Sequence, residues 1–201
     1  MPGCSLLFSV ILRPPLDHAN VGLLTTVIGV ACVDAFERLG DLEVRLKWPN
    51  DVLVSGRKIA GILVESHGVA AGIDAVVAGV GVNVDWPADL LPAEIRATAT
   101  SVTTELSLGA VPTRAELLAE ILLAVETRYE QWLDPSSWGD IVERAHAVSA
   151  VVGRQVTIRY AGGETTTGTA VGIRADGRLE LAFEGRTLAI DAGEIEQIRP
   201  D

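Results

Sequence analysis

The stretch that decides the fold runs LKWPNDVLVSGRKIAGILVE over residues 46–65. Its two apolar, β-branched runs, Val52–Val54 and Ile59–Val64, are typical of paired strands. The glycine-containing loop Ser55–Arg57 between them indicates a β-hairpin. Pro49 ends a shorter strand ahead of the hairpin, because proline has no N–H to give to a ladder. The stretch therefore predicts a strand, a turn and a hairpin.

This stretch holds the only two lysines of the chain, Lys47 and Lys58, whereas the other fourteen of its sixteen basic residues are arginine. Lysine carries a compact ammonium where arginine carries a flat fork. Lys58 begins the returning strand, so we expect it close to the turn at Asn50 and Asp51. A cation, an amide and a carboxylate at one hairpin mouth could hold an anion, an amide-like ligand or a metal-bound phosphate. Ordinary charges on a solvent-facing turn are the alternative.

The composition favours a globular protein of one or two domains with a sizeable core: 201 residues, of which 48% are hydrophobic and 21% charged. The net charge of −11 argues against a nucleic-acid-binding surface. No uninterrupted apolar run has the length of a membrane span. Two isolated cysteines, Cys4 and Cys32, are typical of reduced thiols in the cytoplasm.

The amino-terminal part predicts one strand and one helix. We expect Leu6–Leu12 to be a buried strand, and a chain that opens directly into a core strand is expected to have further sheet partners upstream. A helix capped by Asp17 or Asn20 follows. Its small residues Gly22 and Gly29 would permit close packing against a sheet.

The apolar segment Ala75–Val84 predicts another strand. Gly79 and Gly81, at alternate positions, indicate that something approaches that face closely. Asn83 has donors and acceptors that could contact the edge of a base-like ring. A bulge, with Asn83 entering a turn, is the alternative.

The middle of the chain predicts a loop and two helices. Asp85–Thr104 is expected to be an exposed loop, with Trp86 folding over the end of the preceding strand. A Thr-x-x-Glu capping box from Thr113 predicts the start of a long helix. A second helix is expected over Ser136–Ala147, with His146 on its surface.

From Ala150 onward the pattern changes to short alternating strands separated by glycine-containing turns, of which Asp176-Gly177 is the strongest hairpin signal. Around fifty residues of this kind predict a small antiparallel barrel of SH3-like type. Its sequence has no nucleophile–base pair and no metal-ligand cluster, so a docking or covering role is expected. The predicted strands are Gln155–Tyr160, Thr165–Ile173, Arg178–Phe183 and Arg186–Asp191.

Three segments, in this order and spacing, resemble biotin protein ligases: KWPND at Lys47–Asp51, RKIAGILVE at Arg57–Glu65 and GVGVN at Gly79–Asn83. The resemblance covers essentially the whole chain. It implies an α+β fold, with a mixed sheet and packed helices as in biotin and lipoate ligases, followed by the SH3-like barrel. The expected domains are a partial catalytic domain at residues 1–148 and the barrel at residues 149–201.

The resemblance implies a two-step reaction in the cytoplasm. Biotin and ATP, with Mg²⁺, would give biotinyl-5′-AMP, and a lysine of a biotin carboxyl carrier protein would then accept the biotin. No tightly bound cofactor and no membrane are expected. A homodimer is considered. No winged helix occurs in the sequence, so DNA binding is not implied.

The resemblance assigns the biotin side of the site to two residues of the hairpin. Lys58 would be the catalytic residue and would contact biotin and the carboxyl–phosphate linkage of the adenylate. A fixed cation there favours the negative charge that develops during adenylation. Gly61 would let the backbone approach the biotin ring. Trp48 is expected to pack rather than to contact a ligand.

The nucleotide side is assigned in the same way. Lys47, Asn50 and Asp51 would line the nucleotide and magnesium side, and the Asp51 carboxylate suits a hard cation that carries phosphates. Asn83 would hydrogen-bond adenine.

The sequence departs from the family at its amino end. Family members carry a Gly-Arg-Gly-Arg-like loop ahead of the strand that corresponds to Leu6–Leu12, and this sequence does not contain it. We expect that about the first third of the catalytic domain is missing because the recorded sequence starts late. The alternatives are a catalytically incomplete remnant that only binds ligand or carrier, and a lipoate-type ligase.

Overall fold

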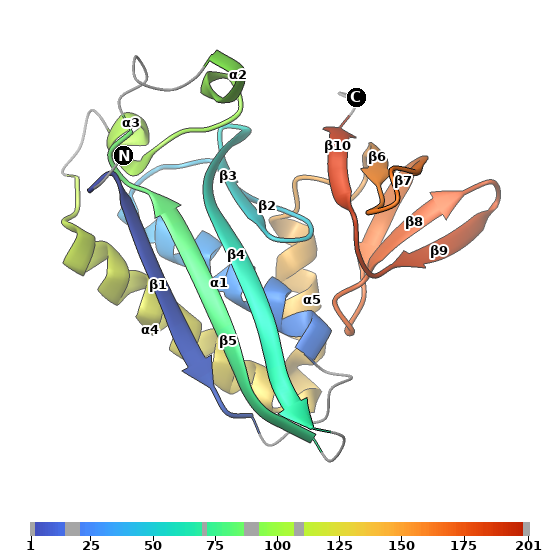
Figure 1. The fold of residues 1–201 in the computed structure, drawn as a ribbon, viewed down its shortest axis with the longest axis horizontal. Helices are drawn as coiled ribbons and strands as arrows, with labels where there is room; N and C mark the ends of the chain where they lie inside the picture. Colours follow the sequence, from blue (N-terminus) through green and yellow to red (C-terminus); the bar gives the residue numbers. More distant parts are fainter. Residues whose placement is uncertain (1–2, 15–20, 70–71, 87–92, 107–110, 199–201) are drawn as a thin grey trace.

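The structure is a computed structural model that describes residues 3–14, 21–69, 72–86, 93–106 and 111–198. Figure 1 shows a larger unit, in which a sheet is backed by helices, beside a smaller unit built from the carboxyl-terminal strands. This arrangement confirms the predicted α+β class.

The larger unit is built on a five-stranded sheet in the order β1-β5-β4-β3-β2. All four strand pairs are antiparallel. The parallel component of the predicted mixed sheet is limited, in the described residues, to two isolated bridges, Leu46 with Ser149 and Lys58 with Ala99. The strands are β1 (Ser5–Leu12), β2 (Val44–Lys47), β3 (Asp51–Val54), β4 (Arg57–Val69) and β5 (Gly72–Asn83).

Helices cover one face of this sheet (Figure 1). Gly29 of α1 lies against β2 so closely that a Cβ on it would be 2.6 Å from Leu46 Cδ1, which confirms the predicted close packing. Asp34 of α1 accepts hydrogen bonds from Arg128 and Arg144, and so ties three helices together. The helices are α1 (Val21–Leu39), α4 (Arg114–Leu133) and α5 (Trp138–Ala147), with the short α2 (Ala93–Arg96), α3 (Val102–Glu105) and η3 (Pro135–Ser137) between them.

The helix boundaries follow the sequence signals where the structure describes them. The predicted capping box is present at the start of α4, with Thr113 and Glu116 bonded reciprocally. The predicted caps Asp17 and Asn20 lie outside the described residues. No helix of the described segments is both long and apolar enough to span a membrane.

The strand β1 differs from the prediction of a buried strand. It pairs with β5 and forms an edge of the described sheet. Leu7 and Ile11 are 76% and 60% exposed, while the alternate residues Phe8 and Val10 pack against the core. A strand with helices on only one face buries only every second side chain, so the apolar run alone could not separate the two cases.

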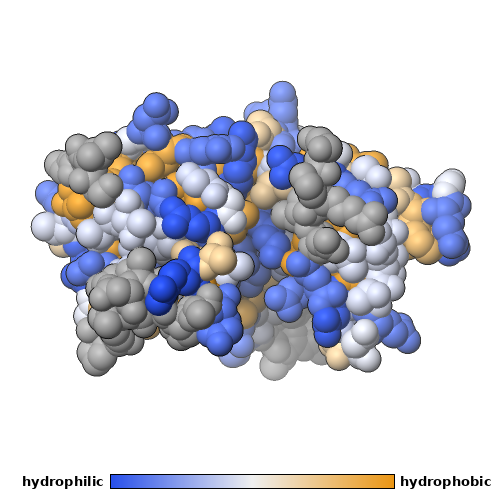
Figure 2. Space-filling view, turned by 90° about the horizontal axis from the view of Figure 1, so that it is seen from above, coloured by the Kyte–Doolittle hydropathy of each residue, from blue (hydrophilic) through white to orange (hydrophobic). Residues whose placement is uncertain are grey.

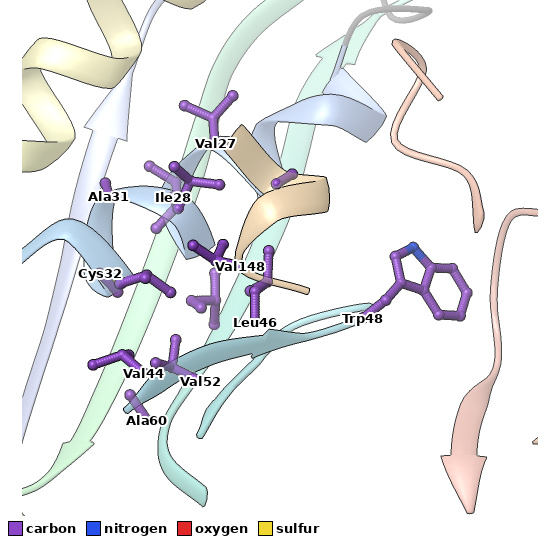
Figure 3. Close-up of a cluster of buried hydrophobic side chains, with 14 of the residues drawn as sticks. Val27, Ile28, Ala31, Cys32, Val44, Leu46, Trp48, Val52, Ala60 and Val148 are labelled. Atoms are coloured by element: carbon purple, nitrogen blue, oxygen red, sulfur yellow. The ribbon is translucent and has the colours of Figure 1, made fainter. Parts of the chain in front are cut away.

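The hydrophobic core lies between the sheet and α1. Figure 3 shows Val27 and Ile28 of the helix gathered with Val44, Leu46 and Val52 of the sheet, while the Trp48 indole points away from them toward the carboxyl-terminal unit. All six side chains are buried, and Trp48 is 3% exposed. The prediction that Trp48 packs is therefore confirmed.

The smaller unit is a second antiparallel sheet, in the order β10-β6-β7-β8-β9. It confirms the four predicted strands and adds a fifth, Glu194–Ile198, that the sequence analysis missed. Its described ladder does not pair β9 with β10, so the small β unit is seen as a five-stranded sheet rather than a closed barrel. The strands are β6 (Gln155–Arg159), β7 (Thr165–Ile173), β8 (Leu179–Phe183), β9 (Arg186–Ile190) and β10 (Glu194–Ile198).

Backbone hydrogen bonds join β2 to the entry of the smaller unit. Leu46 N donates to Val148 O, and Ala150 N donates to Leu46 O, both at 2.8 Å. His146, expected on the surface, is half-buried instead, because its Nε2 accepts from Ile173 N at 2.7 Å. The end of α5 is thereby fixed to β7.

Candidate functional site

The side chain of Lys58 is directed by an irregularity in the hairpin. Val52 lies opposite Ala60, but the next residue, Leu53, lies opposite Lys58, so Ile59 is the extra residue of a β-bulge. Strict alternation would place Lys58 on the same face as the buried Ala60. The bulge places it instead on the face that the helices leave uncovered.

On this open face Lys58 meets two of the other predicted site residues. Its Nζ lies 2.5 Å from Asp51 Oδ1, as expected from the hairpin. A Cβ added to Gly61 would lie 3.2 Å from both Cε and Nζ of Lys58. The absence of a side chain at position 61 therefore makes room for the lysine itself, which is a second reason for glycine there besides the predicted approach of a biotin ring.

The backbone of Lys58 is held by a segment that the sequence analysis expected to be an exposed loop. Lys58 N donates to Thr98 O at 2.8 Å, and Thr100 N donates to Lys58 O at 2.9 Å. Thr100 and Ser101 are 2% and 0% exposed, so the prediction was wrong here. Residues 98–101 have no large apolar side chain, so no apolar periodicity in the sequence could indicate that they are buried. Hydrogen bonds hold them in place instead. Trp86 does fold over the end of the sheet, with its Nε1 3.1 Å from Ser5 Oγ.

The two predicted site asparagines brace the same region. Asn83 Nδ2 donates to Thr100 O at 3.0 Å and to Lys58 O at 3.3 Å. Asn50 Nδ2 donates to Ile62 O at 2.8 Å. Their NH₂ groups are therefore used within the protein, which leaves the amide oxygen of Asn83 for the predicted contact with adenine.

Two pockets meet at Lys58. The first, of about 500 Å³, has a floor of Gly61, Gly79 and Gly81 on the open face of the sheet. It is otherwise mostly apolar, with walls from Leu7, Phe8, Ser9, Asn50, Ile62, Leu63 and Val80.

The second pocket, of about 690 Å³, lies between the two units. Lys47 and Asp51 line it on one side, and Arg159, Glu194 and Glu196 of the smaller unit line it on the other. Arg159 and Glu196 form an ion pair across β6 and β10. Figure 2 shows the surface hollowed between the two units, with hydrophilic residues on both sides. A charged pocket and an apolar pocket thus share one lysine.

The described side chains around Asp51 do not form a complete set of metal ligands. Within the described segments no group of three or more His, Cys, Asp or Glu side chains could hold a metal ion. Mg²⁺ is commonly held by one or two carboxylates together with phosphate oxygens and water. As a single carboxylate, Asp51 fits that arrangement only with an ion whose other ligands are phosphate oxygens and water.

The chain is similar to known proteins in both sequence and structure. Residues 1–83 match the Biotin/lipoate A/B protein ligase family, and residues 151–196 match the Biotin protein ligase C terminal domain. The chain is 36% identical over 182 residues to the biotin–[acetyl-CoA-carboxylase] ligase of Mycobacterium tuberculosis, covering 89% of this chain and 63% of the relative. It is 30% identical to the bifunctional ligase/repressor BirA of Bacillus spizizenii, covering 96% of this chain and 58% of the relative. The chain thus spans about three fifths of the length of these relatives.

Coverage is greater for a third relative and for a solved structure. The chain is 32% identical to the biotin–[acetyl-CoA-carboxylase] ligase of Paracoccus denitrificans, over 97% of this chain and 81% of the relative. The biotin protein ligase of Aquifex aeolicus in complex with biotin and ATP superposes with a TM-score of 0.80 at 25% identity, covering 98% of this chain and 79% of that one. By its sequence and by its fold, the chain belongs to the biotin protein ligase family.

Proposed function

We propose that this protein joins biotin to ATP to form biotinyl-5′-AMP and then transfers biotin to a lysine of a carboxylase carrier protein. A biotin carboxylate oxygen attacks the α-phosphorus of ATP, and the bond to the bridging oxygen breaks, so that pyrophosphate leaves. The carrier amine then attacks the carbonyl of the mixed anhydride, loses a proton and forms an amide as AMP leaves. The proposed place of action is the cytoplasm.

The observation that carries the proposal is the position of Lys58 between the two pockets. The apolar pocket over the glycine floor suits the ring system and chain of biotin, and the charged pocket suits a nucleotide. A group that borders both lies where the biotin carboxylate and the α-phosphate would meet. The ammonium has three N–H donors, of which Asp51 takes one. The others would stabilise the negative charge that builds up during adenylation.

The other predicted residues take supporting parts in this proposal. Lys47 would add positive charge on the nucleotide side, and Asp51 would hold Mg²⁺ brought by ATP. Asn50 would keep the turn in place through its bond to Ile62. Asn83 would offer its amide oxygen to the amino group of adenine. We place the boundary between the catalytic and carboxyl-terminal domains after residue 148.

The acceptor is inferred from the relatives, and its route from the charged pocket. Two of them are ligases of acetyl-CoA carboxylase by name, so the proposed acceptor is the carrier domain of such a carboxylase. The charged pocket is open between the two units (Figure 2), which supports entry of the acceptor lysine from that side.

The test is biotin-dependent exchange of labelled pyrophosphate into ATP. We expect exchange by the unmodified chain and a loss of roughly a hundredfold or more in Lys58→Ala. Glu126→Gln, an exposed change on α4, is the control and should keep the exchange. Biotin binding without exchange by the unmodified chain would favour the non-enzymatic alternative. Exchange that requires lipoate in place of biotin would favour the lipoate-ligase alternative.

A further inference from the structure

The carboxylate of Glu105, at the end of α3, joins β4 at Arg57 to the neighbouring segment at Thr100. Its side chain is 9% exposed. Its Oε1 accepts a hydrogen bond from Arg57 Nη2 at 2.6 Å and another from the hydroxyl of Thr100. One carboxylate oxygen therefore holds both the residue that precedes Lys58 and the residue that binds the Lys58 carbonyl.

This contact matters because a bulge interrupts the regular ladder of a hairpin. At the bulge, both peptide groups of Lys58 are held from outside the hairpin, by Thr98 and Thr100. Two side chains join residues 98–100 to β4: Asn83 through Lys58 O and Thr100 O, and Glu105 through Arg57 and the Thr100 hydroxyl. Charge-assisted hydrogen bonds at a largely buried carboxylate are among the stronger polar contacts available for this.

We propose that Glu105 is a positioning residue for Lys58. By binding Arg57 and Thr100 to the same oxygen, it fixes the bulge and so keeps the ammonium on the open face between the two pockets. Loss of this carboxylate loosens the parallel bridge between Lys58 and Ala99. Lys58 Nζ then moves away from Asp51. The catalytic consequence rests on the proposed function; the position of the ammonium can be tested without it.

The two-lysine composition makes a direct test practical. Reductive methylation with ¹³C-formaldehyde labels Lys47, Lys58 and the amino terminus, and the two lysine signals are assigned with Lys47→Arg and Lys58→Arg. Asp51→Asn gives the signal position of Lys58 without its carboxylate partner. We expect Glu105→Gln to move the Lys58 signal toward that position and Glu105→Ala to move it further, while the Lys47 signal stays in place.

Two variants make the outcome specific. Thr100→Val removes one of the two hydrogen bonds to Glu105 at nearly constant shape, and a smaller shift of the Lys58 signal in the same direction is expected. It also serves if Glu105→Ala does not fold. Glu126→Gln removes the same charge from an exposed position of α4 and should move neither signal. A Lys58 signal that stays in place in folded Glu105→Gln and Thr100→Val would overturn the proposal.

Kinetics supply the second readout. In biotin-dependent pyrophosphate exchange, Glu105→Gln should lower kcat roughly tenfold or more, because the cation acts in the transition state. KM for ATP should change by less than about twofold. No exchange by the unmodified chain would count against the proposed function and leave the spectroscopic test intact. Unchanged kcat together with an unmoved Lys58 signal would refute the positioning role alone.

Discussion

The indole N–H of Trp48 donates a hydrogen bond to the carbonyl of Gly177 at 3.0 Å, between residues 129 positions apart. Trp48 lies in the turn between β2 and β3, which directly precedes Asp51, and Gly177 lies in the turn between β7 and β8. The turn that contains Gly177 packs closely against α1, because a Cβ on Gly177 would lie 2.3 Å from Gly22 O. Through this hydrogen bond, the carboxyl-terminal unit helps to hold the turn that precedes Asp51, on the nucleotide side of the proposed site.

Gly177→Ala tests this support. The φ of Gly177, +82°, disfavours any residue with a side chain. The new Cβ would also lie too close to backbone atoms of Gly22 and Leu23, which cannot move aside locally. We expect a loss of about 1–2 kcal/mol from the left-handed backbone and a further loss of roughly 1–3 kcal/mol from overpacking. Urea unfolding measures the sum.

Gly163→Ala is the matched control for that variant. Gly163 has nearly the same φ, +85°, but a Cβ there would meet nothing within 4 Å. Only the backbone cost should remain. Equal destabilisation by the two substitutions would show that the turn at Gly177 is not tightly packed against α1.

Gly61→Ala should displace the ammonium while leaving the fold intact. The added Cβ would lie 3.2 Å from the end of the flexible Lys58 side chain, which can shift by a few tenths of an ångström. We expect kcat for adenylate formation to fall roughly tenfold because a catalytic group is misplaced, and the methylated Lys58 signal to move. In Gly79→Ala the nearest atom to the new Cβ is 3.6 Å away, so the Lys58 signal should stay in place. Movement in both variants would contradict the assignment of the contact to Gly61.

The capping box of α4 gives a pH-dependent contribution to stability. Hydrogen bonds from Thr113 lower the pKa of Glu116 below its usual 4.5. A carboxyl whose pKa is lower in the folded state stabilises the fold above its unfolded pKa, and this contribution is lost as the pH falls through the folded pKa. Glu116→Gln should therefore lower the urea midpoint at pH 7 and lower it progressively less toward pH 3. Glu126→Gln, later on the same helix, is the comparison. A deficit that is constant over this range would disprove the linkage.

The two cysteines should differ in reactivity. Burial, assisted by the nearby charge of Asp34, raises the pKa of Cys32 to about 12, so at pH 8 only roughly one thiol in ten thousand is ionised. Cys4 is partly exposed. We expect Ellman's reagent to titrate one thiol in the folded chain and two in denaturant. In Cys4→Ser the folded chain should give none, and rapid titration of a thiol in that variant would count against the buried environment of Cys32.

Features that depend on sequence neighbours were predicted well. The hairpin, the capping box of α4 and the strands of the smaller unit follow from residues a few positions apart. The meeting of Lys58 with Asp51 was predicted for the same reason. The Ser55-Gly56 turn is shorter than expected, since Arg57 already belongs to β4.

Contacts between distant segments could not be obtained in this way. Nothing near Thr98 or Thr100 indicates that they pair with Lys58, because the pairing depends on the bulge and on Glu105. The donor group of Asn83 is taken by backbone carbonyls that become its neighbours only in the folded chain. The ligand assignments themselves came from the resemblance and stay predictions.

The bulge at Ile59 makes the register of the hairpin, and not only its residue types, a condition of the site. Lys58 and Gly61 are separated by an odd number of positions, yet they share a face of the sheet, and one surplus residue reconciles the two. If the same sequence formed a regular ladder here, without the bulge, Lys58 would lie on the same face as Ala60 and turn toward the helix-covered side. A change that abolished the bulge would therefore displace the ammonium even if every residue that lines the two pockets were kept.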